Sequence, residues 1–325
     1  MKPLLPILLL LAAAMLPAQK PTPVIFDTDI GDDIDDALAL ALAVQSPELE
    51  VRLVTTVADD VESRTRLAWK ELGLFGRHDI ALAMGAPEPL LDPRRADRAA
   101  QFTVLTPADT VPESARERAA QRIVDVLMYS GEKVTVIAVG PLTNIGLALK
   151  EEPRIRDRIE RIVLMGGSYF PTRREYNIYR DRIAAEVVFQ SGIPITAVGL
   201  DVTTKCRLEG ADLARIRDAG NPASQFLYRL ITLWQGANAG KFPTLHDPLA
   251  VASAVKPSLI ETVSGSVEVE IAAPDSYGAT TFTSEDKLPK DARATVRVAR
   301  DVNVRGFLDL FVGRISAPPR RQKAQ

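Results

Sequence analysis

The chain has 325 residues, of which 46% are hydrophobic and 25% charged, and its formal net charge is −2. This balance is typical of a globular protein and gives no reason to expect nucleic acid or an anionic membrane surface as a partner. The single cysteine, Cys206, excludes an intramolecular disulfide, so core packing and any bound metal must stabilise the fold.

The first 18 residues have the pattern of a secretory signal peptide. Lys2 gives a positive start, residues 4–16 are mostly Leu, Ile and Ala, and Ala18 is a small residue at a suitable cleavage point. The apolar run is too short for a spanning helix, although an uncleaved anchor is the alternative. We expect cleavage near Ala18 and a mature protein that is secreted or periplasmic and no longer bound to the membrane.

Strand-like and helical segments alternate over the next part of the chain. Continuous apolar runs such as residues 134–139 are typical of parallel strands that are buried on both faces. The expected strands span 24–27, 51–57, 80–84, 134–139, 162–165 and 195–200, and the expected helices span 36–45, 62–75, 114–129, 143–150 and 183–190. This alternation predicts an α/β fold with an open, mainly parallel, Rossmann-like sheet flanked by helices.

The last third of the chain changes character. A helical pattern runs from Leu208 to about residue 255, strand-like alternation follows over 266–299, and a closing helix is expected over 305–315. These segments predict additional C-terminal helices and short strands on the same sheet. We therefore expect a single domain over residues 22–316, followed by a polar tail at 317–325.

Six carboxylates fall within ten residues, directly after one apolar run (24–26) and directly before another (37–42): Asp27, Asp29, Asp32, Asp33, Asp35 and Asp36. Two carboxylates ~5 Å apart repel by roughly 3 kcal/mol at an effective dielectric of about 20. A helix N-terminus returns only ~0.3–1 kcal/mol for each acid in its first turn. The crowding therefore favours a bound cation, and all-oxygen ligands indicate Ca²⁺ or Mg²⁺. The alternative is that the acids cap the helix and otherwise face water.

Unusual polar residues also follow other expected strands. Asp59 and Asp60 follow the second strand, residues 140–144 and 166–168 follow two later ones, and Asp201 follows the strand at 195–200. In open α/β sheets, ligands bind at the carboxyl ends of the strands. The sequence therefore predicts a binding site at this edge of the sheet.

Several blocks, in this order and spacing, resemble the inosine–uridine-preferring nucleoside hydrolase family from about residue 24 to 315. The first is the Asp-x-Asp-x-Gly motif that starts at Asp27 and continues to the acidic pair Asp35-Asp36. The others are the segments 55–57, 139–144, 163–167, 175–178, 198–201 and 246–248. Any one of these blocks alone would be a weak signal.

The resemblance implies a Ca²⁺-dependent N-ribohydrolase, which cleaves the N-glycosidic bond of a ribonucleoside to ribose and a free base. It implies that Asp29 binds Ca²⁺ and acts as the base that activates the attacking water. Asp36, Asp247 and the carbonyl of Val139 complete the implied metal site. A water on one face of the sugar and tightly held hydroxyls suit an oxocarbenium-like transition state.

The remaining implied contacts are to the sugar and the base. Asp35 and Asp60 are expected to bind ribose hydroxyls, and Glu175 and Asn177 to hold the far side of the ribose. His246 is expected near the base, where it assists departure by proton donation. The alternative for His246 is a core histidine that orients Asp247.

For three further residues, a role in the site competes with a role in the fold. Trp234 lies in the late helical region and either stacks on the base or belongs to the core. Asp27 is expected to be a structural acid behind the site. Asn144 is expected to cap the helix that follows it.

The chain departs from the family pattern at both ends of the site. The acidic loop is two residues longer than usual, so alignment on the helix selects Asp35 as the ribose-binding acid, and alignment on the glycine selects Asp32 or Asp33. We prefer the helix alignment, because the helix N-terminus sets the direction of the carboxylates.

Other departures lie outside the acidic loop. Asp59-Asp60 replaces the Gly-Asn that is usual in the family, and the segment 92–112 lacks the usual histidine. Arg173-Arg174 stands where an Asn is expected, either to favour an anionic substituent or as a solvated loop.

Two other functions compete with the hydrolase. One is a secreted Ca²⁺-dependent nucleoside- or ribose-binding protein that keeps the site without turnover. The other is a phosphatase of the haloacid dehalogenase type, which expects Thr or Val where Gly31 stands. The family resemblance also implies a homodimer or homotetramer.

Overall fold

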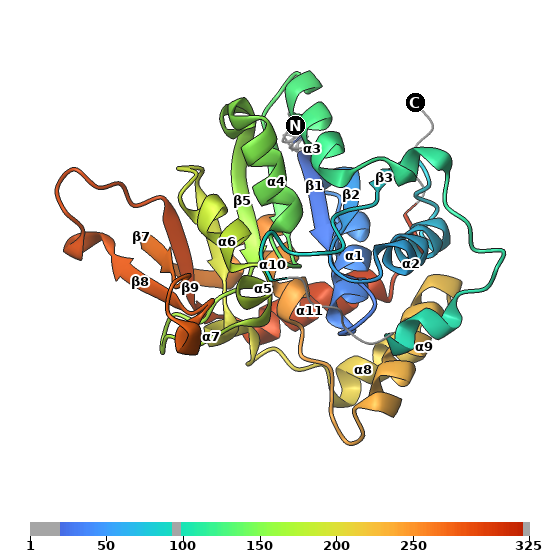
Figure 1. The fold of residues 1–325 in the computed structure, drawn as a ribbon. Helices are drawn as coiled ribbons and strands as arrows, with labels where there is room; N and C mark the ends of the chain where they lie inside the picture. The colour runs from blue at the N-terminus through green and yellow to red at the C-terminus, as the bar shows by residue number, and fades with distance from the viewer. Residues whose placement is uncertain (1–19, 93–98, 321–325) are drawn as a thin grey trace, which may run out of the picture.

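The computed structural model describes residues 20–92 and 99–320, and its core is one mixed sheet (Figure 1). In this part of the chain, nine strands lie in the order β3-β2-β1-β4-β5-β6-β9-β7-β8. The strands are β1 (Thr22–Thr28), β2 (Leu49–Thr56), β3 (Ala81–Ala83), β4 (Val134–Ala138), β5 (Ile159–Met165), β6 (Ile195–Val198), β7 (Ile260–Val269), β8 (Thr280–Ser284) and β9 (Val296–Val302). The predicted signal peptide and residues 321–325 of the predicted tail lie outside the described residues.

The pairing confirms a mainly parallel α/β sheet. Strands β3, β2, β1, β4, β5, β6 and β9 pair in parallel, and only β7 runs antiparallel to its neighbours β9 and β8 among the described strands. The chain starts in β1, builds β2 and β3 on one side, and then crosses to β4 on the other side. The crevice where the strand order reverses, between the ends of β1 and β4, is where open α/β sheets bind ligands.

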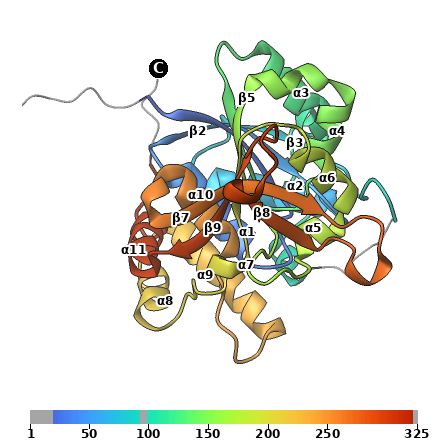
Figure 2. The ribbon, with the colours of Figure 1, turned by 90° about the vertical axis from the view of Figure 1, so that its left-hand side faces the viewer.

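Helices cover both faces of the sheet. They are α1 (Asp35–Gln45), α2 (Val61–Leu74), α3 (Ala119–Tyr129), α4 (Thr143–Glu151), α5 (Tyr176–Arg180), α6 (Arg182–Phe189), α7 (Leu200–Thr203), α8 (Gly210–Arg217), α9 (Pro222–Ala237), α10 (His246–Val255) and α11 (Val304–Ile315). Figure 2 shows α10 and α11 on one side of the sheet and α3 and α4 on the other.

Alternation along the strands divides the core into two layers. Val24 and Phe26 of β1 belong to an apolar cluster with α1, α10 and α11, whereas Ile25 belongs to a second cluster with α3, α4 and α6. Both faces of a central parallel strand are thus apolar, which explains the uninterrupted apolar runs in the sequence.

Helix α1 is enclosed by the first layer, and all 11 of its residues are buried. It packs against α10 and α11. Its apolar residues are mostly Ala and Leu, so it can lie close to its neighbours on every side. The first turn carries Asp35 and Asp36, which places two carboxylates at a buried helix N-terminus.

Three expected elements have different limits. The helix expected over 114–129 begins at Ala119, because Arg118 is extended and bridges Met84 at the end of β3. The strand expected to Leu200 ends at Val198, and Leu200 starts α7. Strand β7 begins at Ile260, six residues before the expected strand region, and the short helix α5 was not expected.

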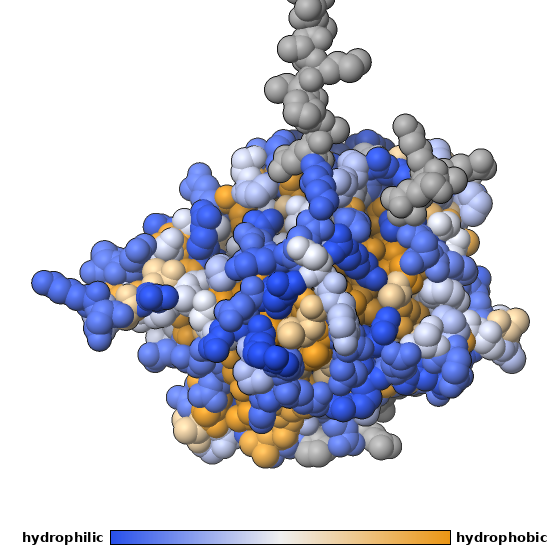
Figure 3. Space-filling model, turned by 90° about the horizontal axis from the view of Figure 1, so that it is seen from above, coloured by the Kyte–Doolittle hydropathy of each residue, from blue (hydrophilic) through white to orange (hydrophobic). Residues whose placement is uncertain are grey.

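No helix in the described ranges 20–92 and 99–320 is long and apolar enough to cross a membrane. On the face shown in Figure 3, hydrophilic residues cover most of the surface and apolar residues show between them. Such a mixture is ordinary for a protein surface in contact with water.

Glu71 of α2 is a fully buried acid. Its carboxyl oxygens have no hydrogen-bond partner within normal range among the described residues. Burial raises the pKa of Glu71 well above its ordinary value of 4.5, and the backbone of Ala41 opposes this shift in part. The folded state therefore loses stability as pH rises from about 4.5 toward the raised pKa.

Replacing Glu71 by Gln should stabilise the protein at pH 8 and have little effect at pH 4.5. Each unit of pKa shift corresponds to about 1.4 kcal/mol of unfolding free energy. Chemical denaturation of both proteins at the two pH values measures the difference. An equal difference at both pH values would contradict a buried, destabilising carboxylate.

Candidate active site

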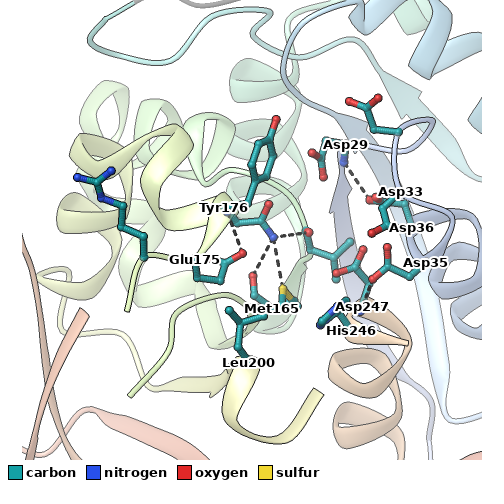
Figure 4. A pocket seen from close by; sticks show the side chains of 14 residues that line it. Asp29, Asp33, Asp35, Asp36, Met165, Glu175, Tyr176, Leu200, His246 and Asp247 are labelled. Carbon is teal, nitrogen blue, oxygen red and sulfur yellow. Dashed lines mark hydrogen bonds between the residues drawn. The ribbon is translucent and has the colours of Figure 1, made fainter. Parts of the chain in front are cut away.

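A cavity of about 420 Å³ opens at the carboxyl ends of the central strands (Figure 4). It is lined by acids from the loop after β1 and the start of α1, and by residues after β4, β5 and β6 and at the start of α5 and α10. The lining residues are Asp29, Asp32, Asp33, Asp35, Asp36, Val139, Met165, Arg174, Glu175, Tyr176, Asn177, Leu200, His246 and Asp247.

Three buried carboxylates meet where the N-termini of α1 and α10 converge. One oxygen from each of Asp35, Asp36 and Asp247 lies within 4.8 Å of the others. The backbone amide of Asp247 donates to Asp35 Oδ2 at 3.1 Å, which ties the two helix starts together. Both helix dipoles present their positive ends here, which stabilises negative charge by a modest amount.

Asp29 lies beside this group and is fixed by its backbone. Its amide donates to Asp36 Oδ1 at 3.1 Å, and Thr28 Oγ1 donates to the same oxygen at 2.5 Å. The side chain of Asp29 points toward the end of β4, where a Cβ atom on Gly140 would lie 2.8 Å from its Oδ1. Glycine at position 140 thus leaves room for the Asp29 carboxylate at the cavity.

The four acids Asp29, Asp35, Asp36 and Asp247 are crowded, and too little positive charge surrounds them to balance four ionised carboxylates. Burial, followed by repulsion from neighbouring acids, raises the pKa values of Asp35, Asp36 and Asp247 well above their usual range. Burial raises the pKa of Asp29 to about 6, although the guanidinium of Arg64 opposes the rise. Buried carboxylates with all-oxygen chemistry fit a hard divalent cation such as Ca²⁺ or Mg²⁺.

The opposite wall is built by the start of α5. Glu175 caps this helix and accepts hydrogen bonds from the amides of Gly167, Asn177 and Ile178 at 2.9–3.1 Å. Asn177 Nδ2 donates to the carbonyl of Val139 at 2.8 Å, so the predicted sugar-binding wall touches the predicted metal carbonyl directly.

His246 is held by α7. Its Nδ1 lies 2.7 Å from Thr203 Oγ1, and burial lowers the pKa of the ring to about 4. The ring is therefore neutral at pH 7, and Thr203 rather than Asp247 orients it. Such a ring can still donate a hydrogen bond to a departing base.

The structure brings most of the predicted site residues together, and Asp32, Asp33 and Asp35 of the acidic loop all line the cavity. Asp35 is 3% exposed and lies in the buried group, whereas Asp32 and Asp33 are exposed. The residues that share the cavity as expected are Asp29, Asp35, Asp36, Val139, Glu175, Asn177, His246 and Asp247. Their individual roles stay predictions.

Two predicted substrate contacts do not line the cavity. Asp60 is exposed and caps α2, where it accepts the amide of Ser63 at 3.0 Å, because the chain turns at residues 58–59 and directs Asp60 along the helix. Trp234 is 9% exposed and packs in the apolar cluster around α1. The core interpretation of Trp234 therefore fits better than stacking on a base.

Replacing Asp60 by Ala should cost about 1 kcal/mol of stability through loss of the cap, and leave kcat/KM within about 2-fold. Replacing it by Asn should restore the stability, since Asn caps as well as Asp. Thermal unfolding and steady-state kinetics measure both. A large loss of kcat/KM in the Asn variant would show that Asp60 acts in the active site.

Some lining residues were not among the predicted site residues, and one neighbour has another role than expected. Tyr176 follows Glu175, and only its place inside the 175–178 block could have indicated it, whereas Arg174 is already a candidate for binding an anionic substituent. Asn144 does not cap α4. Its Nδ2 donates to Asp27 Oδ1 at 2.7 Å and to the carbonyl of Thr56 at 2.9 Å, which joins the ends of β1 and β2. Asp27 lies outside the lining, as expected of a structural acid.

Proteins of known sequence and structure share this architecture. The family model for inosine-uridine preferring nucleoside hydrolase matches residues 24–309. A pyrimidine-specific ribonucleoside hydrolase of Salmonella paratyphi B is 36% identical over 90% of this chain and 98% of its own length. The corresponding protein of Citrobacter koseri is 37% identical with the same coverage.

Solved structures agree with the sequence comparison. A plant nucleoside hydrolase has 29% identity and a TM-score of 0.81 over 92% of this chain and 100% of its own. A purine-preferring ribonucleoside hydrolase from Gardnerella vaginalis has 31% identity and a TM-score of 0.77 over 91% and 98%.

The fold and the acid-lined crevice thus define a hydrolase that acts on N-glycosyl bonds of nucleosides. The chain belongs to the inosine-uridine preferring nucleoside hydrolase family.

Proposed function

We propose that the mature protein is an exported, Ca²⁺-dependent N-ribohydrolase that cleaves pyrimidine ribonucleosides to ribose and the free base. The observation that carries the proposal is the meeting of Asp35, Asp36 and Asp247 within 4.8 Å, beside Asp29 and opposite Glu175 and Asn177. Acids on one wall and a polar sugar-binding wall on the other suit a small polyhydroxylated substrate.

The metal site is proposed to comprise Asp29, Asp36, Asp247 and the carbonyl of Val139, with Asp35 shared between the cation and the ribose. A divalent cation held there supplies positive charge that lowers the pKa of nearby water. Ca²⁺ is favoured over Mg²⁺ because a mixture of carboxylate and carbonyl ligands from separate elements suits its flexible coordination.

The protein's own groups then perform three tasks. Asp29 accepts the proton of the attacking water. Asp35, Glu175 and Asn177 bind ribose hydroxyls and hold the sugar against Asp29, which raises the effective concentration of the two reactants. The neutral ring of His246 donates a hydrogen bond to the departing base, whose negative charge grows as the glycosidic bond breaks, and the free base then takes up a proton from water.

The base preference rests on relatives. The curated relatives at 36–37% identity are pyrimidine-specific, whereas the Gardnerella vaginalis protein at 31% is purine-preferring. A pyrimidine substrate is therefore proposed first. A dimer or tetramer stays a prediction.

The test is release of reducing sugar from uridine, cytidine, inosine, adenosine and guanosine by protein that starts at residue 19. Ca²⁺-dependent release, fastest from uridine or cytidine, is the expected result. Faster release from a purine nucleoside would change the proposed base, and nucleoside binding without release would favour the binding-protein alternative. Release that persists after complete chelation would overturn the Ca²⁺ requirement.

Export is tested separately. Expression of the full chain in a bacterium that exports proteins should give a mature form in the periplasm or medium, with an N-terminus at residue 19. A cytoplasmic product that retains Met1 would contradict the proposal.

A further inference from the structure

Three charged residues with buried side chains form a chain of ion pairs, and none of them lines the cavity. Arg180 Nη2 lies 2.6 Å from Asp59 Oδ1, and the two side chains are 7% and 6% exposed. Arg64 Nη2 lies 3.8 Å from Asp59 Oδ2, and the side chain of Arg64 is 2% exposed. Asp59 thus contacts two arginines, one from α2 and one from the end of α5.

The Arg64 end of this chain holds the acidic loop. Its Nη1 donates to the carbonyl of Ile30 at 2.9 Å, directly after Asp29, and its Nη2 donates to Asp32 Oδ2 at 3.3 Å. Its Nε donates to the carbonyl of Ala58 at 2.8 Å, which joins the acidic loop to the turn that carries Asp59. A buried guanidinium that uses all its nitrogens in this way has one well-defined position.

The Arg180 end holds the opposite wall. Arg180 is the last residue of α5, and the same five-residue helix carries Tyr176 and Asn177 and is capped by Glu175. A contact at Arg180 therefore fixes the end of the helix opposite to the one that faces the cavity. The chain Arg64–Asp59–Arg180 spans the loop of Asp29 and the helix of Glu175 and Asn177.

The turn at Asp59 is itself held in place. Ala58 and Asp59 have φ values of 67° and 57°, in the left-handed region that non-glycine residues rarely adopt. Their amides donate to the carbonyls of Ala86 and Pro87 at 2.9 and 2.7 Å. Such conformations persist where surrounding contacts determine them, so the carboxylate of Asp59 has a defined direction.

We propose that Asp59, Arg64 and Arg180 are positioning residues that set the separation of the two cavity walls, and with it the fit of the ribose. This rests on the proposed N-ribohydrolase function. A buried ion pair is weak evidence for stability, because desolvation offsets the attraction, but it is well suited to fixing one geometry.

The test uses D59N, R180Q, R180K and the double variant D59N/R180Q. The matched control is K70Q/D109N, which removes another ion pair of α2, at 2.8 Å, whose residues do not line the cavity. For each protein, kcat and KM for the best nucleoside, the Kd for ribose, the Kd for Ca²⁺ and the Tm are measured.

D59N and R180Q should each raise KM and the ribose Kd about 10-fold, and the double variant should be no worse than either single one. R180K should recover most of the loss. The Ca²⁺ affinity should stay within about 2-fold, because Arg64 keeps its own contacts to the loop of Asp29 and the carboxylates on α1 and α10 keep theirs. The control should change neither KM nor the ribose Kd.

Three results would overturn the proposal: an unchanged ribose Kd in folded D59N and R180Q, losses that multiply in the double variant, or the same losses in the control. If D59N does not fold, the KM and ribose Kd of R180Q are compared with those of R180K, which keeps the positive charge. A wild-type protein that binds ribose but releases none from any nucleoside would reject the proposed function, and the ribose Kd would still test the positioning role. A folded wild-type protein that neither binds ribose nor releases it from any nucleoside would overturn both the positioning role and the proposed function.

Discussion

Replacing Asp29 by Asn should lower kcat by about 10²–10⁴-fold, the usual contribution of a general base, while the protein stays folded. The amide keeps the size of the carboxylate and the backbone contact to Asp36, which the Asp29 amide makes at 3.1 Å. It cannot accept the proton of the attacking water. Steady-state release of reducing sugar with saturating Ca²⁺ measures the loss.

The matched control is Asp60→Asn, the same change of side chain in an exposed helix cap. Its kcat should equal that of the wild type, since Asn serves the cap equally well. An Asp29→Asn variant that keeps a tenth or more of the wild-type kcat would remove Asp29 from the role of base. A similar loss in both variants would point to a general effect of charge instead.

Replacing Asp247 by Asn should abolish most of the thermal stabilisation that Ca²⁺ provides. A ligand at about 1,000 times its Kd adds roughly 4 kcal/mol to folding, which corresponds to about 5–10 °C in Tm for a chain of this size. Asp247 is one of the three buried carboxylates whose oxygens lie within 4.8 Å. Without it, the cation loses a charged ligand.

The same variant should melt at a higher temperature than the wild type when both are chelated. Burial and repulsion from Asp35 raise the pKa of Asp247 well above its usual range, so a neutral amide relieves that penalty. The control is Asp291→Asn, which changes an exposed acid and should leave the Ca²⁺ effect intact. An equal Ca²⁺ shift of Tm in Asp247→Asn and wild type would exclude this carboxylate as a ligand.

The parallel sheet could be predicted from local patterns. Residues 134–138 are all buried in β4, and four of these five residues are apolar, which is the pattern expected of a strand that is covered on both faces. The acidic pair at the start of α1 was also predictable, because a helix N-terminus directly after a buried strand leaves little choice of direction. Element limits were less certain where a partner distant in sequence decides them, as the bridge of Arg118 to Met84 does for α3.

The contents of the cavity could be predicted only in part. Order and spacing of the motifs brought Glu175, Asn177 and Asp247 to the site, since each follows or starts a recognisable element. The position of Asp60 outside the cavity depends on the left-handed backbone of the two residues before it, Ala58 and Asp59. Positive φ angles at non-glycine residues cannot be read from the sequence. The pairing of Asp59 with Arg180 joins residues 121 positions apart, and many other acids and arginines could have paired instead.

Helix α1, which carries two carboxylates of the site, is expected to be among the last elements to open when the protein unfolds locally. All 11 residues are buried, and its last residue, Gln45, donates to the carbonyl of Arg314 in α11 and to those of Ala317 and Pro318 just after it. Backbone amides in such a helix exchange hydrogen for deuterium only when much of the fold opens. Asp35 and Asp36 therefore belong to one of the last elements to open. When the cation dissociates, the helix that carries these two carboxylates stays folded, and the site can bind another cation.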